Sequence, residues 1–231
     1  MRGGGDGAPE TDQLNRVPTM KLHTFFRSSA SFRVRIALNH KGIAWESVAV
    51  SLPKGEHSDA AFRAINPQGL VPALDDGGRL LTQSLAIIEY LDEVHPGPKL
   101  VPADPIERAY VRAFSQLIAC EIHPMNNLRT LKFIKRTYKL EDEGVNSWYR
   151  HWIAVGFESM EAYLLNEKRH GRYVLHDQVT MADCCLVPQV FNAQRYECDL
   201  KPYPVVMRIF DECMKLESFS AAQPMSQPDA V

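Results

Sequence analysis

The chain has 231 residues, of which 45% are hydrophobic and 23% are charged, and its formal net charge is -2. This length suits one large domain or two small ones, and the composition is that of an ordinary globular protein. The small net charge gives no electrostatic reason to expect a nucleic acid or a membrane surface as partner, and no apolar run approaches the roughly 18 residues of a spanning helix. Residues 1–19 are polar and rich in Gly and Pro, without the apolar centre of a secretory signal, so we expect a flexible extension there.

Strand and helix patterns alternate in the next part of the chain. Residues 21–26 predict a short strand, and apolar residues at helical spacing in 34–38 predict a helix that ends at Lys41-Gly42. Residues 44–50 alternate in polarity and predict a second strand. A hairpin then follows, because VPALD and RLLT flank the Gly77-Gly78 pair.

A helix is predicted from Ser84 through Leu91, and a Pro-rich link around 96–105 closes this first unit. The order strand, helix, strand, hairpin, helix is that of a thioredoxin-like domain. Everything after the link has helical patterns, beginning with one long segment over 106–122. The fold class is therefore an α/β unit over 20–100 followed by an all-helical unit over 106–231.

Two features of the helical part are structural predictions. An apolar stripe with helical spacing runs through 145–155. Thr180 and Asp183 have the spacing of a capping box, with Thr180 as N-cap. Pro188 then interrupts the helix that begins there, and we expect it to kink or end that helix.

The chain has five cysteines, and no pair has C-x-x-C spacing. An odd count without that spacing supports neither a zinc site nor a dithiol redox motif, so no metal is expected. We expect reduced thiols in a cytoplasmic protein, and we expect the adjacent Cys184 and Cys185 to pack as small apolar residues.

Four motifs in this order resemble the zeta class of the glutathione transferases, over roughly residues 21–231. They are RSSASFRVRIAL, NPQGLVPAL, QSLAIIEYLDE and TMADCCLVPQVFNAQRY. The resemblance implies a thioredoxin-like domain that binds glutathione as cofactor, a helical domain that binds the second substrate, and a homodimer.

The resemblance also implies a reaction, the cis–trans isomerisation of a maleyl keto acid. The glutathione thiolate adds to the double bond beside the carbonyl, the resulting single bond rotates, and elimination returns the trans product. Maleylacetoacetate, from tyrosine and phenylalanine breakdown, is the favoured substrate, because Leu128 stands where a second arginine beside Arg129 would favour maleylpyruvate. A general transferase acting on α-haloacids and a non-catalytic glutathione-binding protein stay as alternatives.

Ser28 and Ser29 open the first motif, between the first strand and the first helix. Either serine could serve as a plain helix N-cap. The resemblance implies that Ser28 donates a hydrogen bond to the glutathione sulfur and that Ser29 assists or binds glutathione. Lowering a thiol pKa by about two units needs roughly 2.7 kcal/mol, which one charge-assisted hydrogen bond and a helix N-terminus can supply.

The rest of the glutathione site is also implied by the resemblance. Relatives often carry Cys where this chain has Ala30, so no cysteine is needed here, and the site continues through Ser31, Phe32 and Arg33. A cis Val71-Pro72 bond would turn the Val71 backbone toward the tripeptide, although a plain strand-starting proline fits as well. The γ-glutamyl carboxylate would bind at Gln83 and Ser84, and helix capping is compatible with that role for Ser84. His57 matches a position that contacts glutathione in relatives, but an exposed loop histidine is the more common case for such a residue.

Arginines are the expected ligands of a dianionic substrate, because the guanidinium pairs with a carboxylate through two hydrogen bonds. The resemblance assigns this role to Arg27 and Arg195, either of which could otherwise be a solvated surface charge. Residues of the HPMNNLR stretch are implied to face glutathione or substrate, although a solvated polar turn would look the same; they are His123, Asn127, Leu128 and Arg129. The four-residue spacing of His123 and Asn127 predicts a shared helix face.

Overall fold

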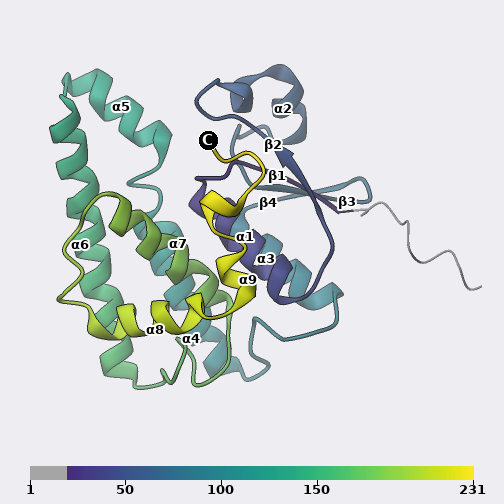
Figure 1. Ribbon diagram of the computed structural model, residues 1–231, viewed down its shortest axis with the longest axis vertical. Coiled ribbons are helices and arrows are strands. Elements are labelled where there is room, and N and C mark those ends of the chain that lie inside the picture. Colours follow the sequence, from purple (N-terminus) through teal and green to yellow (C-terminus); the bar gives the residue numbers. More distant parts are fainter. Residues whose placement is uncertain (1–19) are drawn as a thin grey trace, which may run out of the picture.

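A computed structural model describes residues 20–231 (Figure 1), so the predicted extension over 1–19 lies outside the described residues. The elements of the first half are β1 (Met20–Thr24), α1 (Ser29–His40), β2 (Glu46–Ala49), η1 (Glu56–Ser58), α2 (Ala60–Ile65), β3 (Ala73–Asp76), β4 (Arg79–Thr82) and α3 (Ser84–Val94). Those of the second half are α4 (Pro105–Gln116), the π-helix η2 (Leu117–Ile122), α5 (Leu128–Tyr138), α6 (Asp142–Glu167), α7 (Met181–Arg195), α8 (Pro204–Met214), α9 (Glu217–Ser220) and η3 (Pro224–Ser226).

The four strands form one sheet with the order β2-β1-β3-β4. β1 pairs with β2 in parallel and with β3 in antiparallel, and Leu22 faces Leu74 in the register of the second pair. The turn between β3 and β4 has Gly77 at φ 60° and Gly78 at φ 91°, a conformation that glycine adopts without steric cost. Because α1 connects the parallel strands and the hairpin follows, the thioredoxin-like order is confirmed.

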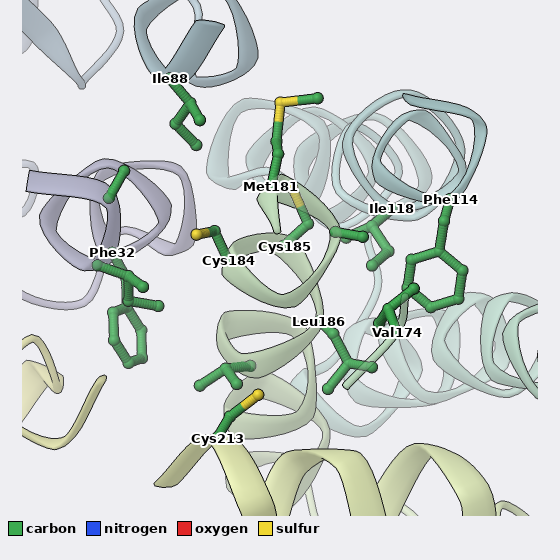
Figure 2. Close-up of a cluster of buried hydrophobic side chains, with 14 of the residues drawn as sticks. Phe32, Ile88, Phe114, Ile118, Val174, Met181, Cys184, Cys185, Leu186 and Cys213 are labelled. Carbon is green, nitrogen blue, oxygen red and sulfur yellow. The ribbon is translucent and has the colours of Figure 1, made fainter. Parts of the chain in front are cut away.

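α7 lies in the centre of the molecule, packed against α1 on one side and against α4 and α8 on the other (Figure 1). Figure 2 shows Cys184 pointing toward Phe32 and Ile88, while the Phe114 side chain lies on the opposite side of α7. Cys184 and Cys185 are fully buried, and burial raises the pKa of both thiols. The expectation that they pack as small apolar residues is therefore confirmed.

The capping box is confirmed, since the Thr180 N–H donates to Asp183 Oδ2 at 2.8 Å and the Thr180 side chain accepts the Asp183 backbone N–H. The prediction that Pro188 could end the helix is wrong, because α7 continues through it to Arg195. A proline in a helix interior costs about 3 kcal/mol. Nearly every residue from Met181 to Ala193 is buried, and this packing offsets the cost.

The predicted helix over 106–122 changes from α to π at Leu117, so it is two segments.

The link between the halves is held by a buried ion pair, in which Lys41 Nζ lies 3.1 Å from Asp92 Oδ1. Asp92 also accepts the Leu100 N–H at 2.9 Å. The division of the chain into units at this link stays a prediction. Within residues 20–231, no helix is both long and apolar enough to cross a membrane.

Candidate active site

Two adjoining cavities lie between the sheet half and the helical half. The larger, which we call the outer cleft, has a volume of about 650 Å³, and the smaller, the inner pocket, has about 220 Å³. Six residues line both cavities and so mark the passage between them: Gln68, Leu70, Val71, His123, Asn127 and Arg129. The outer cleft contains Ser28 and Ser29, and the inner pocket contains Gln83 and Ser84.

Ser28 lies at the N-cap of α1 and lines the outer cleft. Its Oγ accepts the Ser31 N–H at 3.2 Å, and its own N–H donates to the Phe25 carbonyl at 2.9 Å. A hydroxyl that accepts a hydrogen bond still has one proton to donate. The plain capping role and a donor role toward the cleft are therefore compatible in the same side chain.

Ser29 is held from the opposite half of the molecule. Asn192 of α7 donates through Nδ2 to Ser29 Oγ at 2.6 Å, and both residues are buried. Sequence reasoning did not identify Asn192, although it stands three residues before Arg195 in the same motif and so shares its helix face. This hydrogen bond ties the start of α1 to α7 beside the cleft.

The Val71-Pro72 peptide bond is cis, as predicted, and Val71 lines both cavities. Gln83 precedes α3 with φ 69°, and its Nε2 donates to Gln68 Oε1 at 2.9 Å. Ser84 is the first residue of α3, and its hydroxyl accepts a hydrogen bond from Arg33 Nη1 at 3.2 Å. The alternative that the Ser84 side chain caps this helix is wrong, since Gln83 occupies the N-cap position and no side-chain cap bond forms there among the described residues.

Arg33 lines the inner pocket with a side chain that is 2% exposed. Its Nε and Nη2 are buried and have no hydrogen-bond partner among the described residues, and burial lowers the pKa of this guanidinium. Unpartnered buried donors call for an acceptor, which a bound carboxylate would provide.

Ala30 lines the same pocket, but Ser31 and Phe32 line neither cavity. Their assignment to the glutathione site is corrected, because both are packed inside the molecule.

His123 ends the π-helix, and Asn127 is the N-cap of α5, where its Oδ1 accepts the Arg129 N–H at 3.1 Å. The turn between them means that they do not share a helix face, so that prediction is wrong. Both nevertheless line both cavities, and Leu128 lines the outer cleft. Burial, followed by the nearby charges of Arg33 and Arg129, lowers the pKa of His123 to about 3, so its imidazole is neutral near pH 7.

The outer cleft is strongly cationic. Among the residues of 20–231 that line it, none is Asp or Glu, while five are basic: Arg27, Arg63, Arg129, Lys132 and Arg195. Arg27 lies 4.8 Å from the centre of the Phe26 ring, and Arg195 lies 4.9 Å from that of Tyr196. Sequence reasoning missed Arg63 and Lys132, because no local pattern shows whether a basic residue on a helix surface faces a cleft or the solvent.

His57 also lines the outer cleft, with Nδ1 buried and without a partner among the described residues. Burial lowers the pKa of His57, and the charges of Lys132 and Arg63 lower it further. His57 is therefore part of the cleft wall and is not a plain exposed loop histidine. In the described part of the chain, no three His, Cys, Asp or Glu residues gather into a group that could hold a metal.

Known proteins show the same combination of sequence and fold. The sequence profile "Glutathione S-transferase, N-terminal domain" matches residues 22–99. A protein from Vibrio cholerae named probable maleylacetoacetate isomerase is 46% identical, covering 90% of this chain and 97% of its own length.

Two solved structures extend the comparison. A holo structure of maleylpyruvate isomerase, described as a bacterial zeta-class glutathione transferase, is 47% identical with a TM-score of 0.89, over 91% of this chain and 100% of its own. The maleylacetoacetate isomerase of Methylobacterium extorquens AM1, solved with bound malonate and glutathione, is 41% identical with a TM-score of 0.89, over 91% and 99%.

Proposed function

Because the chain belongs to the zeta class of the glutathione transferases, the family of the maleylacetoacetate and maleylpyruvate isomerases, we propose that it isomerises maleylacetoacetate with glutathione as cofactor. The observation that carries this proposal is the outer cleft, where Ser28 shares the lining with five Lys and Arg side chains and, among residues 20–231, with no carboxylate. A cleft of this charge favours a dianionic substrate and a thiolate.

The residues around the two cavities fit glutathione, which has two carboxylates and an extended peptide backbone. The inner pocket would take the γ-glutamyl end, where the first amides of α3, the Ser84 hydroxyl and the unpartnered Arg33 donors meet. Val71 would pair with the cysteinyl unit through its backbone, since it lines both cavities. His57 is a neutral hydrogen-bonding group at the outer side of this path.

Bound glutathione supplies a thiolate that adds reversibly to the substrate double bond and leaves again, so it is regenerated. Ser28 stabilises that thiolate by donating its free hydroxyl proton, and the N-terminus of α1 adds a favourable dipole. Arg27 and Arg195 orient the two substrate carboxylates in the outer cleft. The neutral His123 ring can donate a hydrogen bond to an oxyanion that develops on the substrate. Because the ring carries no charge, it does not compete with the arginines for the substrate carboxylates.

Two related substrates differ in the length of the keto-acid chain, and Leu128 favours the longer one. It lies beside Arg129 with 39% of its surface exposed, and it lines the outer cleft. An apolar side chain there accepts the one additional methylene group of maleylacetoacetate, whereas maleylpyruvate would use a further cation. Such a role places the protein in tyrosine and phenylalanine breakdown.

We also propose that the protein forms a homodimer in the cytoplasm, as the family resemblance implies.

The substrate assignment is tested by comparing kcat/KM for maleylacetoacetate, maleylpyruvate and an α-haloacid at saturating glutathione. The proposal predicts the highest value for maleylacetoacetate, and it predicts that Leu128→Arg shifts the ratio toward maleylpyruvate. A higher value for maleylpyruvate in the wild-type protein would reassign the substrate within the family. Turnover of the haloacid alone would make the protein a general transferase, and glutathione binding without any turnover would make it a non-catalytic binder.

A further inference from the structure

The last residues of the chain lie beside the end of β1, which leads directly into the active-site turn. In Figure 1 the yellow C-terminal segment crosses from α9 toward the strands. There the Phe26 N–H donates to Asp229 Oδ2 at 2.9 Å, a contact between residues 203 positions apart. The other oxygen, Asp229 Oδ1, is buried and has no partner among the described residues.

Arg35 of α1 holds the same stretch from its other side. Its Nη2 donates to the Phe26 carbonyl at 3.0 Å, and its Nε donates to the Ala222 carbonyl at 3.0 Å. Arg35 is fully buried, which lowers its pKa to about 10, while the charge of Asp229 raises it. The guanidinium therefore stays charged near pH 7, and it links the C-terminal segment to the chain ahead of Ser28.

Phe26 thus has both of its backbone polar groups held by side chains outside the turn, Asp229 and Arg35. β1 ends at Thr24 and α1 begins at Ser29, so the residues between them belong to neither element and are held by side chains. Within this turn the Ser28 N–H donates to the Phe25 carbonyl. The position of the Ser28 hydroxyl in the cleft depends on the backbone of Phe25 and Phe26. Asp229 holds the N–H of Phe26, and Arg35 holds the carbonyls of Phe25 and Phe26 at 3.4 Å and 3.0 Å.

We propose that Asp229 is a positioning residue for catalysis, which fixes the turn over 25–28 so that Ser28 faces the sulfur of bound glutathione. This inference rests on the proposed function, because it assumes a thiolate at Ser28. Asp229 touches neither cavity, so it acts through Phe26. The final residues of the chain are then part of the active-site machinery.

The test compares Asp229→Ala, which removes the acceptor, with Asp229→Asn, which keeps an oxygen that can accept the Phe26 N–H. Asp211→Ala is the matched control, since Asp211 is an exposed aspartate on α8. Three quantities are measured: the hydrogen-exchange rate of the Phe26 amide, the thiol pKa of bound glutathione from thiolate absorbance, and kcat for isomerisation.

We expect Asp229→Ala to raise the Phe26 exchange rate about threefold to tenfold, as the loss of one hydrogen bond predicts. We also expect a higher thiol pKa and a lower kcat, and near wild-type values for Asp229→Asn and Asp211→Ala. Faster exchange in Asp229→Ala with unchanged thiol pKa and kcat would overturn the positioning role and leave a purely structural contact. A wild-type protein that binds no glutathione would instead overturn the proposed function, and this inference with it.

Discussion

Ser28→Ala separates the two roles of the active-site hydroxyl. The capping bond to the Ser31 N–H is lost, which costs about 1 kcal/mol of stability, yet α1 stays folded because its apolar face is buried. The donor to the thiolate is lost as well, and a charge-assisted hydrogen bond of about 1.5–3 kcal/mol corresponds to about one to two pKa units. If Ser28 acts as proposed, the thiol pKa of bound glutathione rises by that amount.

Such a shift lowers the thiolate fraction at pH 7 by about 3-fold to 25-fold, starting from a thiol pKa two units below its free value. The assay is a pH titration of thiolate absorbance in the glutathione complex, with isomerisation rates measured alongside. Ser28→Thr retains the hydroxyl and serves as the conservative control. Ser29→Ala should raise the thiol pKa less than Ser28→Ala does, since the Ser29 side chain is buried and held by Asn192, although its hydroxyl keeps one proton to donate. An unchanged thiol pKa in Ser28→Ala would refute the thiolate role of Ser28.

Three further predictions test other parts of the site. Asn192→Leu removes the bond to Ser29 and leaves that hydroxyl unpaired, which should lower the free energy of unfolding by about 1–3 kcal/mol in urea titrations. Lys132→Gln should raise the KM of the dianionic substrate about twofold to fivefold at low salt, whereas Lys135→Gln, which removes a partner of Asp142 outside the cleft, should not. The pKa of His123 is about 3 in the folded protein and 6.5 ordinarily, so the unfolded chain binds a proton at a higher pH than the folded protein does. The contribution of His123 to the free energy of unfolding should therefore fall as the pH drops below 6.5. Nitrogen NMR of the folded protein should show a neutral His123 ring at pH 5.

The local features of the fold could be predicted from the sequence because each depends on neighbouring residues. The strand and helix order, the glycine turn of the hairpin and the capping box at Thr180 are of this kind. Pro188 shows the limit of that reasoning, since its local cost as a helix breaker is offset by burial of the whole helix. Burial of α7 comes from packing against both halves, and no short window of sequence contains that information.

The candidate site divides in the same way. Ser28 and the cis bond before Pro72 follow from motifs, and the structure places both at the cleft. The hydrogen bond between Asn192 and Ser29 joins residues 163 positions apart, so only the folded chain reveals it. The hydrogen bond that Arg33 donates to the Ser84 hydroxyl joins residues 51 positions apart, so the local capping pattern at Ser84 does not reveal it.

Proton NMR of maleylacetoacetate with substoichiometric glutathione tests the central claim most directly. An isomerase that regenerates its cofactor converts many equivalents of the cis substrate into the fumaryl product for each glutathione present. The protein should therefore drive the conversion to completion, and no conversion should occur without glutathione. Conversion that stops after one equivalent with a stable glutathione adduct, or that proceeds equally without glutathione, would contradict the account.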